Sequence, residues 1–258
     1  MAHSADSFGA YGRRWPSLVG AANAADRLVT GVIALALAVA GLFAAYALWD
    51  TYELVESSTA GAAGLTFADY LAANEDVVGW LVIDNTGIDY PVVQGEDDYE
   101  YLTTSATGSY SASGAIFLDA ACSAAFDEPY AVIMGHHMTA SAMFGDLDLF
   151  LDEEFFAENS TGALYLLDRT LYLEVVAVLE VDAYDKVIYG VPADVGDMAS
   201  IVERIGELVI FEREGAYSAD DQLIALSTCS SDGATARTVL ICRVSGEGEA
   251  VDPAEIGG

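Results

Sequence analysis

The chain has 258 residues, of which 41 are acidic and nine basic, giving a formal net charge of −32. This balance argues against a nucleic-acid partner, because phosphate binding needs clustered lysines and arginines. Apolar residues make up 53% of the chain, so it can bury a substantial core and is not a disordered polymer.

The first predicted element is a membrane-spanning helix. Residues 28–49, LVTGVIALALAVAGLFAAYALW, are 22 residues without a charge, enough to cross a hydrocarbon core of about 30 Å. Arginines precede this segment and acidic residues follow it, so the positive-inside rule places residues 1–27 in the cytoplasm as a short tail and the remainder outside the cell. The alternative is a cleaved signal peptide with a small-x-small site at Ala45–Ala47, although the apolar run exceeds the usual core of about 7–15 residues.

The remaining chain is expected to form a stalk and one extracellular domain. Residues 50–65, which include SSTAGAAG, predict a helical stalk that breaks into a linker. Residues 66–246 contain neither a composition break nor a repeat and are predicted to be a single catalytic domain. Residues 247–258 are polar and rich in glycine, and we expect a flexible acidic tail.

Short β-like runs, rich in Val, Ile, Leu and Tyr and bounded by Gly, Asp, Asn or Ser, dominate the outer domain. Eight such runs predict a mainly β domain, folded as a closed barrel or a sandwich. Helical patterns interrupt them at residues 143–159 and 197–211. The runs are VVGWLVI, DYPVVQ, GAIFLD, YAVIMG, GALYLL, TLYLEVVAVLEV, QLIALST and TVLICRV.

The last two runs predict an antiparallel hairpin whose polar loop is flanked by Cys229 and Arg237. Residues that face each other in such a pair have Cβ atoms about 5 Å apart, so Arg237 can reach the surroundings of Cys229. Arg243 lies about 20 Å farther along the strand and cannot. Cys242 lies in an apolar strand and is interpreted as a small hydrophobic residue.

Three cysteines do not make a disulfide framework for an extracellular domain. Either one pair forms and one thiol stays free, or all three are free, and the spacing leaves the partner of Cys122 open. A free thiol in an oxidising compartment must be buried or used, which points towards a functional cysteine.

Two adjacent histidines, His136 and His137, follow the β-run that ends at Met134. Loops after strands commonly present catalytic groups. Because no Cys-x-x-Cys, His-x-x-x-His or carboxylate cluster accompanies the histidines, a metal is not expected. A cysteine nucleophile needs a proton acceptor, which His136 can supply, and acyl transfer needs a donor to the oxyanion, which Arg237 can supply.

The segment LSTCSSDGATAR, preceded by GHHM and MFGDL, resembles the active-site signature of sortases, the membrane-anchored cysteine transpeptidases of Gram-positive surfaces. Their pattern is Thr-Leu-x-Thr-Cys, an arginine several residues later and an upstream Gly-His; Ala225 replaces the first Thr here. GWLVIDNTGIDYPVVQGEDDYEYL and SGAIFLD are similar to class B members in particular. The resemblance covers residues 67–244.

The resemblance implies an eight-stranded sortase-type β-barrel with N-terminal helices and a long helix before the penultimate strand. It maps the nucleophile to Cys229, the general acid and base to His136 and the oxyanion donor to Arg237, and it gives His137 a role in supporting its loop. Candidate substrate-binding residues are Ser227 and Thr228 beside the cysteine, Leu102 at an apolar groove position, and Asp98 where relatives often have Asn.

The resemblance further implies that Cys229 cleaves the C-terminal sorting signal of secreted proteins, forms a thioester, and transfers the protein to an amine of a peptidoglycan precursor. The resemblance implies no metal or organic cofactor. A sortase that polymerises pilins through a lysine amine is an alternative. A cysteine hydrolase with the same acyl-enzyme and a non-catalytic, membrane-tethered binding module also stay open.

Overall fold

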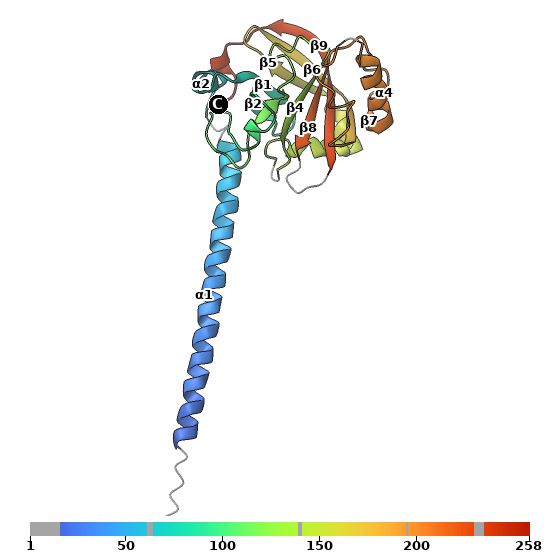
Figure 1. Ribbon diagram of the computed structural model, residues 1–258. Coiled ribbons are helices and arrows are strands. Elements are labelled where there is room, and N and C mark those ends of the chain that lie inside the picture. The colour runs from blue at the N-terminus through green and yellow to red at the C-terminus, as the bar shows by residue number, and fades with distance from the viewer. Residues whose placement is uncertain (1–15, 61–63, 139–140, 195, 230–234) are drawn as a thin grey trace, which may run out of the picture. The chain divides into compact units, whose positions relative to one another are not determined.

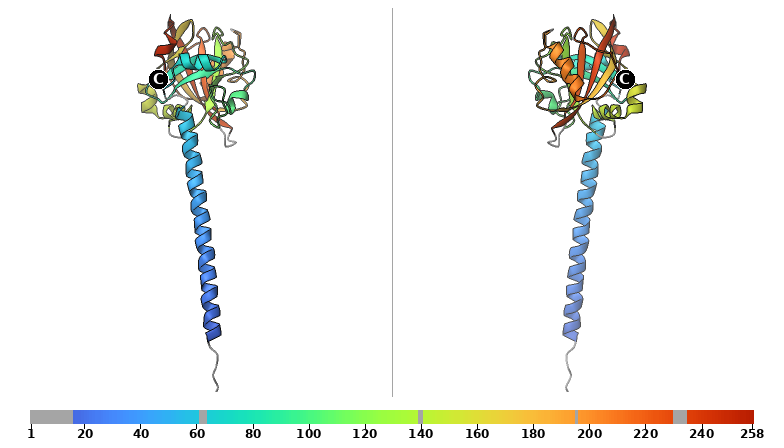
Figure 2. Two further views of the ribbon diagram at one scale, coloured as in Figure 1. Left: turned by 90° about the vertical axis from the view of Figure 1, so that its left-hand side faces the viewer. Right: turned by 90° about the vertical axis from the view of Figure 1, so that its right-hand side faces the viewer.

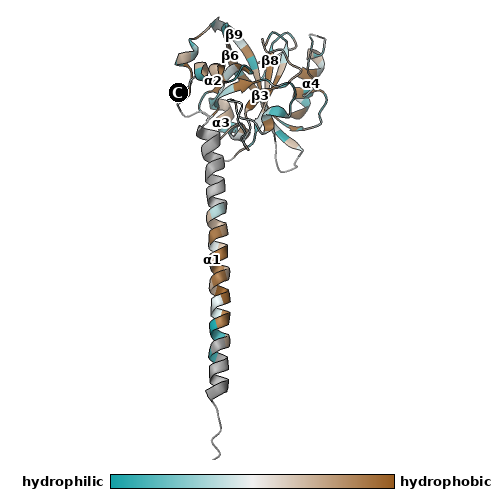
Figure 3. Cartoon of the chain, turned by 60° about the vertical axis from the view of Figure 1, so that its left-hand side comes forward, coloured by the Kyte–Doolittle hydropathy of each residue, from teal (hydrophilic) through white to brown (hydrophobic). Residues whose placement is uncertain are grey.

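The computed structural model describes residues 16–60, 64–138, 141–194, 196–229 and 235–258, with the side chains of Cys229 and of both ends of the first helix outside the described part. Two compact units divide near residue 52. The first contains most of helix α1 (Pro16–Ala60). Within the described residues, one helical stretch, Ala25–Tyr46, is long and apolar enough to span a membrane, with a mean hydropathy of 2.5 and no burial. This stretch begins and ends three residues before the predicted span, residues 28–49. Figure 3 shows it as largely brown, the colour of hydrophobic residues.

The second unit is a β-barrel (Figure 1). Its strands run in the order β5-β1-β2-β3-β4-β8-β9-β6, and pairing of β5 with β6 closes the ring, so the predicted eight-stranded barrel is confirmed. Neighbouring strands are antiparallel except for the parallel pairs β2–β3 and β4–β8. The barrel strands are β1 (Val77–Ile83), β2 (Asp89–Val93), β3 (Ile116–Leu118), β4 (Tyr130–His136), β5 (Thr161–Tyr165), β6 (Arg169–Asp182), β8 (Leu223–Cys229) and β9 (Ala236–Glu249).

Helices α2 (Phe67–Ala73) and α4 (Met198–Leu208) lie on opposite sides of the barrel (Figure 2). Helix α4 buries Met198, Ile201 and Ile205, which share one helical face. Strand β8 therefore has two buried faces: Ile224 points into the barrel, while Leu223 packs in the layer under α4. Because both faces of β8 are buried, its sequence is a continuous apolar run rather than an alternating one.

Two helical predictions require correction. The pattern at 143–159 divides into η2 (Gly145–Leu151) and α3 (Glu153–Glu158), because Asp152 has an extended backbone and caps α3 by accepting the N–H of Phe155 at 2.9 Å. In the pattern at 197–211, the helix ends at Leu208. Strand β7 (Val209–Glu212) follows as a ninth strand and pairs with residues 177–179 of β6.

The C-terminal residues do not form the expected flexible tail. Strand β9 continues to Glu249 in register with β6, and η3 (Pro253–Glu255) leads back to the barrel. The side chain of Ile256 is buried beside α2, and its carbonyl oxygen accepts the N–H of Phe67 at 2.9 Å. One apolar residue in a polar stretch thus has a core position that composition did not reveal.

Candidate active site

The parallel pairing of β4 and β8 places the backbones of His136 and Cys229 directly opposite each other. Adjacent strands lie about 4.8 Å apart, so the two residues meet at the same end of the barrel although they are distant in sequence. The side chain of Cys229 and the loop 230–234 after it lie outside the described residues.

The predicted hairpin of β8 and β9 is present, with Ser227 paired to Val239. Continuing this register by two residues aligns position 229 with Arg237. At the intervening pair, the Thr228 hydroxyl bonds to the backbone of Thr238. It accepts the N–H of Thr238 at 3.1 Å and donates to the Thr238 carbonyl at 3.4 Å. Thr228 thereby fixes the strand that carries Arg237.

A cavity of about 320 Å³ lies at this end of the barrel. It brings together three of the predicted substrate-binding residues, Asp98, Ser227 and Thr228, with Arg237. Leu102 does not line the described cavity; its side chain packs in the cluster under α2. The lining residues are Asp98, Asp119, Met134, Ala183, Tyr189, Ser227, Thr228 and Arg237.

Sequence reasoning missed Tyr189 and Asp119 in this cavity. The Tyr189 hydroxyl lies 2.9 Å from the Ser227 hydroxyl. Burial raises the pKa of the Asp119 carboxyl, the nearby Asp98 charge adds to the rise, and the N–H of Ala121 opposes it. Tyr189 belongs to no motif in the sequence. The aspartate at the end of the run GAIFLD was the sole available signal.

The imidazole of His136 is oriented by a backbone carbonyl. Its Nε2 atom lies 2.8 Å from the carbonyl oxygen of Leu102. Because a carbonyl oxygen can only accept, Nε2 carries a hydrogen and donates, which leaves Nδ1 as the nitrogen that can gain or lose a proton. The carbonyl oxygen of Leu102 thus contributes to the site.

His137 has a different partner from His136. Its Nε2 atom lies 2.7 Å from the carboxylate of Asp148. Among the described residues, no group of three or more His, Cys, Asp and Glu side chains is placed to hold a metal ion.

The two other cysteines are free thiols buried away from solvent. Burial raises the pKa of Cys122 and of Cys242 to about 12 each; the carboxylates of Asp119, Glu128 and Asp98 add to the rise at Cys122. Arg243, on the strand of Cys242, pairs with Glu174 and lies 3.9 Å from Asp221, in register with Leu223 at the opposite end of β8. Neither Cys242 nor Arg243 reaches the cavity.

Thiol labelling is expected to distinguish Cys229 from these two residues. Only thiolates react rapidly with a methanethiosulfonate reagent, and a thiol with a pKa near 12 is almost wholly protonated at neutral pH. Peptide mapping of the labelled native protein should find the modification at position 229. Labelling of Cys122 or Cys242 before unfolding would contradict their burial.

Tyr189 is held by a turn built on Asp185. One carboxylate oxygen of Asp185 accepts the N–H groups of Val187 and Ile188 at 3.0 Å, and the other accepts Arg204 at 2.6 Å. The Tyr189 N–H donates to the Asp185 carbonyl at 3.2 Å. Burial alone would raise the pKa of Asp185, but these hydrogen bonds outweigh it and hold the pKa below its ordinary value.

Substituting Asp185→Asn is expected to lower the free energy of unfolding by about 2 kcal/mol at neutral pH, because the lost hydrogen bonds involve a charged acceptor. The pKa of Asp185 is lower in the folded state, so its contribution is complete above the ordinary value of 3.8 and is lost as the pH falls through the folded pKa. Denaturant titrations of both proteins from neutral to acidic pH check this. A stability gap that does not narrow on acidification would contradict it.

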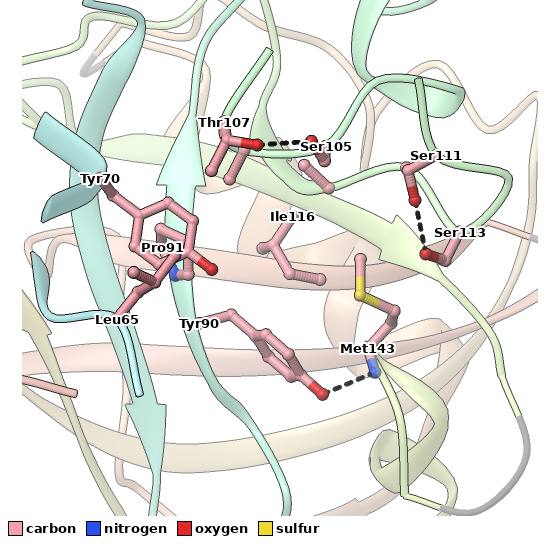
Figure 4. A pocket seen from close by; sticks show the side chains of 13 residues that line it. Leu65, Tyr70, Tyr90, Pro91, Ser105, Thr107, Ser111, Ser113, Ile116 and Met143 are labelled. Carbon is pink, nitrogen blue, oxygen red and sulfur yellow. Dashed lines mark hydrogen bonds between the residues drawn. The ribbon is translucent and has the colours of Figure 1, made fainter. Parts of the chain in front are cut away.

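A second cavity, of about 180 Å³, lies between α2, β2 and the segment 105–116 (Figure 4). Four of its hydroxyl groups pair with one another: Ser105 with Thr107 at 3.0 Å, and Ser111 with Ser113 at 2.8 Å. Gly114, which also lines it, is the point where this segment turns against the backbone of Leu102. The segment that forms this cavity wall therefore packs directly against the carbonyl that orients His136.

Comparisons of the sequence and the fold with known proteins identify relatives of the chain. No model of a protein family matches the chain. It is 30% identical over 165 residues to Sortase B of Listeria monocytogenes, covering 64% of this chain and 67% of that protein. Among solved structures, it resembles a class B sortase of Streptococcus pyogenes involved in pilus biogenesis, with 31% identity, a TM-score of 0.62, and coverage of 70% of this chain and 98% of the other. Sortase B of Clostridium perfringens follows at 28% identity, a TM-score of 0.62, and coverage of 68% and 97%.

Proposed function

Because the chain belongs to the sortase family, we propose that it is a membrane-anchored cysteine transpeptidase that joins secreted proteins to the cell wall. The observation that supports this most directly is the register of β4, β8 and β9, which pairs the backbones of His136 and Cys229 and, continued by two residues, aligns position 229 with Arg237 at the cavity. The family resemblance supports the residue types, and this register supports their proximity.

In the proposed reaction, the Cys229 thiolate attacks the carbonyl carbon of the threonine in a C-terminal sorting signal, forming a carbon–sulfur bond. Arg237 donates hydrogen bonds to the oxyanion that develops. The carbon–nitrogen bond then breaks, and the departing amine takes a proton from Nδ1 of His136. The product of this half-reaction is a thioester on Cys229.

In the second half-reaction, an amine of a peptidoglycan precursor attacks the thioester. His136 accepts the proton of that amine, and Cys229 leaves as a thiolate, so the enzyme returns to its starting state. We assign substrate contacts to Asp98, Ser227 and Thr228 at the cavity, and to Leu102 on the adjoining segment.

The proposed location is the cell membrane, with α1 as a single-pass anchor, the preceding residues in the cytoplasm and the barrel outside. The exposed apolar stretch of α1 supports an anchor, and Arg27 lies within the first turn of this stretch, at its N-terminal end. Arg13 and Arg14, which contributed to the sequence prediction, lie outside the described residues.

The test incubates the full chain in detergent micelles with sorting pentapeptides and candidate amines, and follows its intact mass. A thioester adduct that a supplied amine removes, with formation of the peptide–amine product, is the expected result. Cys229→Ala should form no adduct, whereas Cys242→Ala, which also removes one thiol, should form it. Release of free peptide acid alone would indicate a hydrolase, and no adduct with any peptide would favour a binding module.

A pilin-polymerising role is the second candidate, because the similar Streptococcus pyogenes protein is involved in pilus biogenesis. The same assay separates the two roles by the amine that resolves the thioester. A pilin lysine side chain should be the better acceptor for a polymerase, and a peptidoglycan amine for an anchoring enzyme.

A further inference from the structure

The carboxylate of Asp148 joins two segments of the site that are far apart in sequence. Its Oδ2 atom lies 2.7 Å from Nε2 of His137, just after β4. Its Oδ1 atom accepts the hydroxyl of Thr238 on β9 at 2.7 Å. Asp148 itself lies in η2, so three separate elements meet at one side chain.

Each partner in this network is a direct chain neighbour of a residue assigned to the chemistry. His137 follows His136, and Thr238 follows Arg237. Thr238 is in turn bonded through its backbone to Thr228, the residue before Cys229. The chain of contacts therefore touches the backbone on which every proposed catalytic side chain is mounted.

The described residues of the loop that carries His137 also contact one another. The loop folds back through an isolated bridge between His137 and Met143 and a hydrogen bond of 3.0 Å from the Phe144 N–H to the His136 carbonyl. These contacts close the loop on itself. The bond from Thr238 to Asp148 extends the connection to the arginine strand.

We propose that Asp148 is a positioning residue that ties the histidine loop to the arginine strand and so sets the spacing between His136 and Arg237. This inference rests on the proposed transpeptidase function. Proton transfer and oxyanion stabilisation both need groups held close to their productive geometry, so a small relaxation of this spacing lowers turnover.

An exposed ion pair makes little contribution to global stability, and the His137 and Asp148 side chains are 42% and 44% exposed. The two roles therefore predict different results. A merely structural Asp148 would leave turnover nearly unchanged when removed, whereas a positioning Asp148 would lower kcat in a protein that unfolds at almost the same temperature.

The experiment compares Asp148→Ala, Asp148→Asn and Glu207→Ala in the full chain. Asp148→Ala should lower kcat for transpeptidation by about tenfold with little change in KM, as expected for a group that acts on the transition state. Asp148→Asn keeps an acceptor for Thr238 and should restore most of the activity. Glu207→Ala removes an exposed ion pair of similar length, 2.6 Å to Arg204, away from the cavity and should change nothing.

Thr238→Val supplies the second arm, because it removes the hydroxyl while keeping a β-favouring shape. It should lower kcat as Asp148→Ala does, and the double variant should be no worse than either single variant, since both break one connection. Additive losses, or a kcat of Asp148→Ala within twofold of the unsubstituted protein, would overturn the proposal.

Hydrogen–deuterium exchange keeps the proposal testable if no sorting peptide is processed. Asp148→Ala should raise amide exchange in both 141–148 and 236–240, and Glu207→Ala in neither. If exchange rises in Asp148→Ala but the unsubstituted protein forms no thioester, the transpeptidase function is refuted and the connection between the histidine loop and the arginine strand is retained. Unchanged exchange in both segments would overturn the connection itself.

Discussion

Replacing Arg237 by alanine is expected to lower kcat/KM for thioester formation by about 10²–10³, the usual effect of removing one oxyanion donor, about 3 kcal/mol. Arg237 lines the cavity with Ser227 and Thr228, and the register of β8 and β9 aligns it with Cys229. The loss should fall on acylation, which stopped-flow release of a peptide reporter measures. Binding of the uncleaved peptide should change much less.

Two other arginine variants sharpen this prediction. Arg237→Lys should retain part of the activity, because an ammonium keeps the charge but lacks the planar fork of a guanidinium. Arg243→Ala is the matched control on the same strand: Arg243 pairs with Glu174 at the end of β8 remote from Cys229, so kcat/KM should stay close to that of the unsubstituted protein. Equal losses in Arg237→Ala and Arg243→Ala would contradict the assignment.

Replacing Gly114 by alanine is expected to damage both the fold and the active site. Gly114 has φ of +60°, and a Cβ there would lie 2.4 Å from the carbonyl oxygen of Tyr101 and 2.7 Å from that of Leu102. The backbone must move to relieve this clash, and the Leu102 carbonyl is the group that orients His136. We expect the free energy of unfolding to fall by about 3 kcal/mol and activity to fall further than the folded fraction explains.

Gly108 provides the matched control for Gly114. It has φ of +79°, yet a Cβ added there would meet no atom within 4 Å. Gly108→Ala should therefore carry only the cost of a left-handed alanine, about 1 kcal/mol, and leave turnover intact. Thermal unfolding and turnover at a temperature where both variants are folded separate the two effects. Full activity in Gly114→Ala would contradict the link from Leu102 to His136.

Local patterns were sufficient for much of the fold. All eight predicted β-runs became barrel strands, because β-branched and aromatic residues bounded by turn residues favour an extended backbone over a few residues. The hairpin of Cys229 and Arg237 could be predicted for the same reason, since its strands are joined by a short loop. The end of the helix in segment 197–211 was predicted wrongly, because an apolar pattern does not show where the period changes from helix to strand.

Packing decided the positions that depend on distant segments. Ile256 has a core position only because α2 lies beside it, and Tyr189 reaches Ser227 only through the turn of Asp185. Leu102 has a further role for a similar reason: its carbonyl oxygen holds the histidine, which an apolar side chain in the sequence does not indicate.

The apolar N-terminal segment, the barrel strands and the cysteine–arginine hairpin follow from short-range sterics and hydrophobic periodicity, which a single stretch of chain contains. The meeting of His136 with Cys229 does not, because these residues lie on parallel strands joined by a long connection. Their register is set by the burial of both faces of β4 and β8, inside the barrel and under α4. The same tertiary packing brings Asp148 between His137 and Thr238, which no spacing in the sequence indicates.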